Sequence, residues 1–337
     1  MSSMIRSRQR WLLLPGVCAL ALLRSIDPAG AQPQPARVTF LTNYVFQGRH
    51  APFFLGRDKG FYREAGFDLN IVPATGSGFV ISAIDSAKAD YGMAESASVV
   101  QAVARGAKVK GFAVFMDVST SGLASLQPHP TPQSVVGKPI AASLTDSARV
   151  ILPVVFSRAR LDASRINWVT SDPSVYFSLL LGGRVELITA SSDGDVPTLR
   201  RAAESRRQTV HFASFADWGY DVFGYFLVAR ADRLAGADAQ ARAFATATSR
   251  AVQYAIGHPD EAAQSVSRAA PALPAATALA QWKESIPSIQ TAFVRQHGYG
   301  QATEARLRQT IALVSEALSL NPTPAPIDVY GDKFLKR

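Results

Sequence analysis

The chain has 337 residues, of which 35 are Lys or Arg and 26 are Asp or Glu, and its formal net charge at pH 7 is +9. The basic residues are scattered and form no stripe with interleaved aromatics, so the composition gives nucleic-acid binding little support. The single cysteine, Cys18, lies in an N-terminal segment that we expect to be removed. A mature chain without cysteine has no disulfide, no thiolate metal site and no cysteine nucleophile.

The N-terminal segment has the pattern of a secretory signal. Arg6, Arg8 and Arg10 precede the apolar run "WLLLPGVCALALL", and a small-residue site ends at Ala31. A membrane anchor is the alternative, but the run has only about 13 residues, whereas about 20 are needed to span a bilayer. We therefore expect cleavage near Ala31, which removes residues 1–31 and leaves a periplasmic protein.

Strands and helices are expected to alternate in the first part of the mature chain. Apolar alternation, helical spacing and turn residues predict strands over 37–43, 67–72, 90–94 and 108–118, and helices over 51–65, 79–89 and 95–107. Pro52 lies in the first turn of its helix, where a missing N–H costs little. This order implies a mostly parallel sheet covered by helices.

A second alternation follows a stretch rich in proline and polar residues, "LQPHPTPQSVVGKP", at 126–139. Here the pattern predicts strands over 139–144, 166–171, 185–190, 208–215 and 224–230, and helices over 145–159, 172–183 and 194–205. Thr145 or Asp146 is the expected cap of the first of these helices and Asp172 that of the second. Further alanine-rich helices are expected up to about residue 317.

The two alternations predict an α/β chain of two lobes, each with a mostly parallel sheet flanked by helices. We expect lobe 1 to comprise 32–126 and 224–337 and lobe 2 to comprise 127–223, with crossings near Gln127 and Phe223. Two crossings form a hinge, and two open sheets that face each other leave a central cleft. Ligands of such sheets bind outside the carboxyl ends of the strands.

Several segments resemble one protein family. They are "FLTNYVFQGRHAPFFLGRDKGFYREAGFDLNIVPATGSG", "ADYGMAESASVVQAVARGAKVKGFAV", "GKPIAASLTDSAR", "INWVTSDPSVYFSLLLGGRVELITA" and "FADWGYDVFGYFLVAR". Together they resemble ABC-transporter solute-binding proteins of the thiamine-pyrimidine-precursor and nitrate/sulfonate/taurine (SsuA/THI5-like) group. The pyrimidine-binding members often carry an aspartate–tryptophan pair where this chain has Asn43 and Tyr44.

This resemblance implies a two-lobed periplasmic-binding-protein fold. Such a protein acts as a monomer, closes on a small solute and delivers it to a membrane permease and its ATPase. A fungal relative of this fold makes the thiamine pyrimidine with a cysteine-rich motif, which a cysteine-free mature chain cannot have. The sequence also has no GxSxG, HExxH or dinucleotide fingerprint, so we expect a binding protein without a cofactor and not an enzyme.

The candidate ligand-binding residues lie at expected strand ends and helix starts. Tyr44 offers a stacking face, Glu95 a partner for an amino group, and the Gly76–Gly78 turn exposed N–H groups. His50 is either a ligand donor or a structural residue, and Trp218 either covers a ring or packs the hinge. The full set is Asn43, Tyr44, His50, Ser77, Gly78, Glu95, Ser96, Thr145, Asp146, Ser191, Asp193, Asp217 and Trp218.

The residue types in this set favour a flat, pyrimidine-like or other heteroaromatic solute. Clustered arginines, which a small oxyanion would need, are absent from the set. The histidines form no spacing typical of a metal site, so no metal is expected. A sulfonate, nitrate or aromatic carboxylate remains the alternative solute, and presentation of the closed form to a receptor remains the alternative role.

Overall fold

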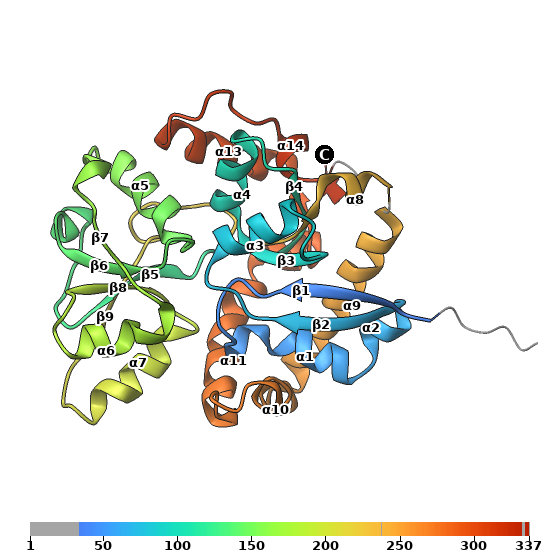
Figure 1. The fold of residues 1–337 in the computed structure, drawn as a ribbon, viewed down its shortest axis with the longest axis horizontal. Coiled ribbons are helices and arrows are strands. Elements are labelled where there is room, and N and C mark those ends of the chain that lie inside the picture. The colour runs from blue at the N-terminus through green and yellow to red at the C-terminus, as the bar shows by residue number, and fades with distance from the viewer. Residues whose placement is uncertain (1–33, 237, 332–333, 337) are drawn as a thin grey trace, which may run out of the picture. The chain divides into compact units, whose positions relative to one another are not determined.

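Two five-stranded mixed sheets organise the chain, and helices flank both of them (Figure 1). The computed structural model describes residues 34–236, 238–331 and 334–336, so the expected signal segment, residues 1–31, lies outside the described residues. In each sheet four strands run in one direction and one runs against them. The predicted α/β class with two mostly parallel sheets is confirmed.

The first sheet has the strand order β2-β1-β3-β10-β4. Its parallel register begins with Ala36 opposite Phe67 in the pair β1–β2. The alternating pattern of 67–72 places every second side chain of β2 in the core, as expected of a half-buried strand. The strands are β1 (Ala36–Leu41), β2 (Phe67–Val72), β3 (Tyr91–Glu95), β4 (Val109–Met116) and β10 (Tyr225–Arg230).

The second sheet has the strand order β7-β6-β8-β5-β9. The strand β6 is parallel to β7 and β8, whereas β5 is antiparallel to β8 and β9. The strands are β5 (Ser121–Ser125), β6 (Pro139–Ala142), β7 (Asn167–Thr170), β8 (Leu187–Ser191) and β9 (His211–Ser214), and a further short pair joins β11 (Ala302–Thr303) to β12 (Leu335–Lys336).

The strand β5 was not expected, and it changes where the chain crosses between the sheets. Because β5 pairs with β8 and β9, the first crossing is the segment 117–120 between β4 and β5, and not a segment near Gln127. The sequence "SGLAS" has mostly small residues of weak strand propensity, which hid the strand. The return crossing, 215–224, contains Phe223 as expected. The division into two lobes stays a prediction, because Pro35–Arg337 forms one compact unit.

The one antiparallel strand of each sheet is the strand that the chain enters after it crosses from the other sheet. A chain that leaves the carboxyl end of one sheet enters the other sheet at the edge where that sheet's parallel strands end. It must therefore run against them, and both β5 and β10 do so. As a result, the amino ends of β5 and β10 lie at the same edge as the carboxyl ends of their neighbours.

The helices follow the expected order, with local differences. The expected helix 51–65 is divided at Gly60, whose φ of 79° belongs to the left-handed region that favours glycine. The helices are α1 (Ala51–Asp58), α2 (Phe61–Glu64), α3 (Ser77–Asp85), α4 (Ser96–Ala104), α5 (Ala148–Arg158), α6 (Tyr176–Leu181), α7 (Asp195–Glu204), α8 (Ala231–Gly236), α9 (Asp238–Gly257), α10 (Pro259–Ala269), α11 (Ala275–Ile289), α12 (Ala292–His297), α13 (Glu304–Ala317) and α14 (Pro326–Val329).

Single 3-10 turns add η1 (Gly48–His50), η2 (Pro132–Val135), η3 (Ala163–Arg165) and η4 (Pro173–Val175). Asp172 caps η4, because its carboxylate accepts a hydrogen bond of 2.9 Å from the N–H of Ser174. The cap position of α5 is Ser147, and not Thr145 or Asp146 as expected.

The cores lie on both faces of each sheet. In the first sheet Phe40 faces the cluster formed with α1, α9, α10 and α11, while its neighbour Leu41 faces the cluster formed with α3, α4 and α13. Phe244 of α9 stacks on Tyr91 of β3, with ring centroids 4.4 Å apart. Such aromatic pairs add about 0.5–1.5 kcal/mol beyond the burial of their area. The packing fixes the strand ends, and with them the side chains that follow.

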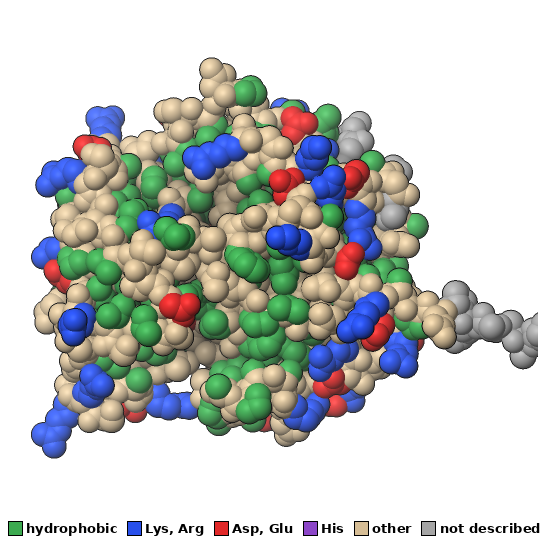
Figure 2. All heavy atoms as spheres, in the orientation of Figure 1, with side chains coloured by type: hydrophobic (Ala, Val, Ile, Leu, Met, Phe, Trp, Pro, Cys, Tyr) green, Lys and Arg blue, Asp and Glu red, His purple; other side chains and the backbone are tan. Residues whose placement is uncertain are grey.

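None of the helices in the described part of the chain combines the length and the apolar character that a membrane crossing requires. On the face drawn in Figure 2, the basic side chains are dispersed and lie among acidic ones.

Candidate ligand-binding site

A cavity lies where the strand ends of the two sheets meet. Its lining comes from both sheets and comprises Asn43, Tyr44, Gln47, Arg49, Gly76, Ser77, Ser121, Gly122, Asp146, Ser147, Ala148, Thr189, Ala190, Ser191, Asp195 and Tyr225. The cavity has about 40 Å³ of space, which is room for roughly three water molecules. The two sides of the cavity are the first sheet with its helices and the second sheet with its helices. A solute of ring size therefore requires these two sides to stand further apart than they do here.

Arg49 reaches across from η1 to the second sheet and is only 1% exposed. Its guanidinium donates hydrogen bonds to four side chains, those of Gln47, Thr120, Ser191 and Tyr225. Its Nη2 also lies 3.0 Å from the Oδ1 of Asp193. Burial lowers the pKa of Arg49, but the carboxylate of Asp193 and other neighbours outweigh burial and raise it. The arginine is therefore a buried, charged residue that joins the two sides.

Asp146 and Asp195 are the carboxylates of the lining. Asp146 lies after β6 and accepts hydrogen bonds from Ala148 N (2.9 Å), Thr189 Oγ1 (2.7 Å) and Tyr176 OH (3.2 Å). Burial raises the pKa of both Asp146 and Asp195, because desolvation disfavours the ionised form.

Asp195 starts α7 and is bonded from both sheets. Its Oδ1 accepts a hydrogen bond of 2.7 Å from Gln47 Nε2, and its Oδ2 accepts two of 2.9 Å from the N–H and hydroxyl of Ser191. Gln47 follows β1, so this contact bridges the two sides.

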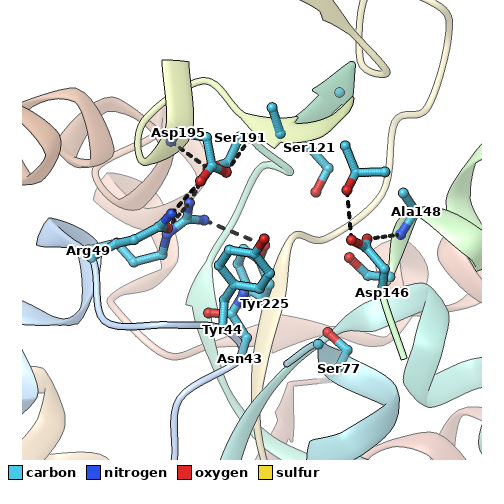
Figure 3. A pocket seen from close by; sticks show the side chains of 16 residues that line it. Asn43, Tyr44, Arg49, Ser77, Ser121, Asp146, Ala148, Ser191, Asp195 and Tyr225 are labelled. Carbon is cyan, nitrogen blue, oxygen red and sulfur yellow. Dashed lines mark hydrogen bonds between the residues drawn. The ribbon is translucent and has the colours of Figure 1, made fainter. Parts of the chain in front are cut away.

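Two tyrosines supply the aromatic faces of the cavity. Tyr44 follows β1 and packs against the core cluster of the second sheet. Tyr225 lies at the start of β10 and beside the Arg49 guanidinium, whose carbon is 5.6 Å from the ring centroid. Burial raises the pKa of both phenols, so they are neutral hydrogen-bonding groups. Figure 3 shows the two rings between Asp195 on one side and Asp146 on the other.

His50 lies behind the lining and orients one of its residues. Its Nδ1 accepts from the N–H of Gln47 (3.0 Å), so its Nε2 carries the proton and donates to the Oδ1 of Asn43 (2.9 Å). Burial and the nearby Arg49 hold the pKa of this ring well below its usual value, which keeps the ring neutral. Asn43 thus has its oxygen bound and presents its amide nitrogen as a donor. Of the two roles left open for His50, its placement supports the structural one.

Glu95, Ser96 and Asp193 were expected at the cleft, but they do not line the cavity. The carboxylate of Glu95 is buried at the end of β3, where Ser119 of the first crossing donates to its Oε1 at 2.7 Å. Burial raises the pKa of Glu95 to about 8. The N–H of Ser96 donates to the Gly224 carbonyl of the return crossing at 2.8 Å. Glu95 ends β3 and Ser96 begins α4. Through these hydrogen bonds the two residues fix the first crossing and the return crossing to the end of β3.

Gly78 and Thr145 also lie outside the lining and join the two sides at its rim. The N–H of Gly78 donates to the Thr145 carbonyl at 3.0 Å, and the Ser143 hydroxyl donates to the Thr75 carbonyl at 2.7 Å. Gly76 is needed here, because a Cβ at this position would lie 2.2 Å from the Thr145 oxygen. The small-residue turn thus allows the backbones of the two sides to meet.

Asp217 and Trp218 are placed away from the cavity, contrary to expectation. Asp217 is exposed, and the indole N–H of Trp218 donates to the Pro130 carbonyl at 3.2 Å. Trp218 also packs on Phe215 with ring centroids 6.0 Å apart. The return crossing is held against the second sheet in this way, which supports the packing role of Trp218.

The predicted residues that the structure brings together at the cavity are Asn43, Tyr44, Ser77, Asp146 and Ser191. Contact with a ligand stays a prediction for all of them. The sequence did not point to Gln47, Arg49, Ser121, Thr189, Asp195 and Tyr225. Within the described ranges, no three His, Cys, Asp or Glu side chains are grouped as a metal site would require.

A model of one protein family, NMT1/THI5 like, matches residues 47–262, well over half of the chain. The chain belongs to the NMT1/THI5-like family. The match includes η1 with Arg49, the loop that carries Asp146 and the start of α7, so most of the cavity lining lies within the family domain.

Curated relatives match one segment of this NMT1/THI5-like chain. The 4-amino-5-hydroxymethyl-2-methylpyrimidine phosphate synthase of Schizosaccharomyces pombe is 32% identical over 91 residues, which are 27% of this chain and 26% of the synthase. The synthase THI5 of Saccharomyces cerevisiae is 33% identical over 91 residues, which are 27% of each chain. The chain thus aligns with only about a quarter of the length of these relatives.

Solved structures show the periplasmic-binding-protein fold over most of the chain. The alkanesulfonate-binding protein SsuA from Xanthomonas axonopodis pv. citri, bound to MOPS, has a TM-score of 0.66 at 14% identity, and the match covers 91% of this chain and 100% of SsuA. A protein from Bordetella bronchiseptica RB50 has a TM-score of 0.69 at 15% identity, with 89% and 95% covered. At these identities the likeness shows the fold alone.

Proposed function

We propose that the chain is the extracytoplasmic solute-binding component of an ABC importer. It captures a small, flat heteroaromatic solute with amino or carbonyl edges between its two sides and delivers it to a membrane permease and its ATPase. The observation that carries this proposal is the cavity between the sheets, where Tyr44 and Tyr225 lie among hydrogen-bonding groups from both sides. The capture step needs only binding and closure, because contacts to both sides favour the closed state.

The contacts across the cavity support closure as the working step. Gln47 and Arg49 belong to the first side, and their partners Asp195 and Ser191 belong to the second. Gln281 of α11 adds hydrogen bonds to Gly194 O (2.6 Å) and Thr198 Oγ1 (3.0 Å). These bonds join the two sides directly, as the contacts of a captured solute would.

A small oxyanion is the second candidate solute, and the size of the cavity favours it. Nitrate or a short sulfonate needs less space than a ring. The lining opposes it, because Asp146 and Asp195 are carboxylates and the guanidinium of Arg49 is already bonded to protein oxygens. We therefore rank the heteroaromatic solute first.

Calorimetry on the mature chain, residues 32–337, tests the proposed function. The titrated panel contains an aminopyrimidine, an aromatic carboxylate, a short alkanesulfonate and nitrate. We expect the aminopyrimidine to bind most tightly. Tight nitrate or sulfonate binding without binding of any ring compound would contradict the heteroaromatic solute.

We also propose that the protein is exported, loses residues 1–31 and works as a periplasmic monomer. N-terminal sequencing of the periplasmic fraction is expected to begin at Gln32. The 91-residue match to synthases leaves a catalytic role as the competing possibility, and incubation of the protein with the bound solute, followed by mass spectrometry, should return the solute unchanged. Uptake of labelled solute is compared between wild-type cells and cells that lack the permease. Uptake that depends on the permease supports delivery to it, and uptake that does not would favour a receptor as the partner.

A further inference from the structure

We infer that the solute carries a positive charge, and that Asp193 makes the cavity selective for cations by holding Arg49. This inference rests on the proposed function, since it assigns the charge of the solute for the same cavity. It follows from three features: the hydrogen bonds that Arg49 already makes, the contacts of the buried Asp193, and the acceptor positions that two carboxylates of the lining leave open.

Arg49 is the only Lys or Arg among the described residues that line the cavity. Its terminal nitrogens already donate to the oxygens of Thr120, Gln47 and Ser191 and to the Tyr225 hydroxyl. A guanidinium has five N–H donors, and four of them belong to these nitrogens. The fifth, on Nε, is buried and has no hydrogen-bond partner. An incoming anion that engages the terminal nitrogens would have to displace bonds that are in place.

Asp193 supplies the negative charge that a bound anion would otherwise bring. It is fully buried, its Oδ1 lies 3.0 Å from the Arg49 Nη2, and its Oδ2 accepts a hydrogen bond of 2.8 Å from the hydroxyl of Ser285. Arg49 and Ser285 lie on the first side and Asp193 follows β8 of the second. The carboxylate thus balances the charge of Arg49 from within the protein and contacts both sides.

The lining charges with which a solute can pair are the carboxylates of Asp146 and Asp195. Each accepts three hydrogen bonds from the protein, whereas a carboxylate has about four acceptor positions. Each therefore keeps one position for a donor of the solute. The two carboxylates lie on opposite sides of the tyrosine rings (Figure 3). Burial raises the pKa of both, because desolvation disfavours the ionised form, and an adjacent cation would stabilise that form.

Arg149 does not reverse this balance. It acts on Asp146 from outside the lining, and its guanidinium donates to Ser143 O and to Ala142 O (3.1 Å) while it stacks over Trp168. Arg49 and Arg149 carry two positive charges near the cavity. Asp146, Asp193 and Asp195 carry three negative charges, so one negative charge is left over. A ligand with N–H donors and one positive charge complements this site.

Three pyridines of equal ring size test the inference by calorimetry at pH 7.5 and low salt. They are 4-aminopyridine, which is a cation, nicotinamide, which is neutral, and nicotinate, which is an anion. We expect 4-aminopyridine to bind at least tenfold more tightly than nicotinamide, and nicotinate to bind most weakly. Equal binding of the three would overturn the inference and leave ring capture intact, whereas binding of none would overturn both.

Matched Asp→Asn variants test the roles of the carboxylates. D195N is expected to lose at least tenfold of the preference for the cation, and D193N is expected to shift the ratio of cation to anion affinity at least tenfold towards nicotinate. D217N makes the same change at an exposed site away from the cavity and should keep the wild-type ratio. An unchanged ratio in D193N would overturn the role of Asp193. Should D193N not fold by circular dichroism, D193S keeps a hydroxyl beside Ser285, removes the charge and serves in its place.

Discussion

Replacement of Glu95 by Gln is expected to remove a large part of the pH dependence of folding stability. The carboxyl of Glu95 is buried and accepts one hydrogen bond from Ser119, while its Oε2 has no partner. Glutamine keeps the size of the side chain and an acceptor for Ser119. It also has no charge at any pH, so it mimics the protonated carboxyl.

The magnitude follows from the shift in pKa between the unfolded and folded states. Burial raises the pKa of Glu95 from 4.5 to about 8. Between these values the folded protein binds a proton that the unfolded chain has lost, so the free energy of unfolding falls as pH rises, by about 1.4 kcal/mol per unit. The total loss is about 5 kcal/mol and is complete above about pH 8. Asp146 and Asp195 act in the same direction, since burial raises the pKa of both.

Urea unfolding of the wild type and E95Q from pH 4.5 to pH 9 measures the effect. The two proteins should have similar stability at the acidic end, and E95Q should be the more stable by several kcal/mol at pH 9. E316Q changes an exposed carboxylate on α13 and is the matched control, with the wild-type slope expected. Parallel stability curves for the wild type and E95Q would refute the argument.

Three further predictions concern the cavity and its rim. Tyr44→Ala should weaken solute binding by more than about 1 kcal/mol, or about fivefold in Kd by calorimetry, through lost stacking and burial; Phe79→Ala, which removes an exposed aromatic outside the lining, should leave Kd unchanged. Gly76→Ala should lower the free energy of unfolding by about 1–3 kcal/mol, because φ is 146° and the Thr145 oxygen is 2.2 Å from the new Cβ, and a smaller loss for Gly60→Ala, where the space is open, is the comparison. Small-angle scattering should show a smaller radius of gyration with a verified, saturating solute than without it, and an unchanged value would count against closure.

The order of strands and helices could be predicted because most elements carry a clear period. The residues 67–72 alternate strictly, and Pro52 and Gly66 mark the ends of a helical region. The strand β5 has no such period, since its residues are small and its flank is rich in proline. Its absence from the prediction moved the expected crossing by several residues.

The rule that ligands lie at the carboxyl ends of parallel strands found Asn43, Tyr44, Ser77, Asp146 and Ser191. The same rule could not find Tyr225 or Ser121, because these residues begin strands that run against their neighbours. Their amino ends, and not their carboxyl ends, lie at the cavity. The position of such a strand depends on tertiary pairing that the local pattern does not contain.

Arg49 was missed for a different reason. A single arginine beside a histidine is typical of a solvent-exposed helix start. Nothing in the local sequence indicates that the side chain of Arg49 is buried. Its burial depends on Asp193, which lies far along the chain. Asp193 and Asp195 also show that two nearby carboxylates at one strand end have different roles, one paired with Arg49 and one in the lining.

The place of β10 in the first sheet has a consequence for how the protein is made. The strands β3 and β4 do not pair with each other, because β10 lies between them and joins to both. Tyr225–Arg230 is synthesised after every strand of the second sheet. Until it arrives, β3 and β4 each present an unpaired edge, and such edges pair readily with other chains. The first sheet is therefore completed only after the whole second sheet has been synthesised.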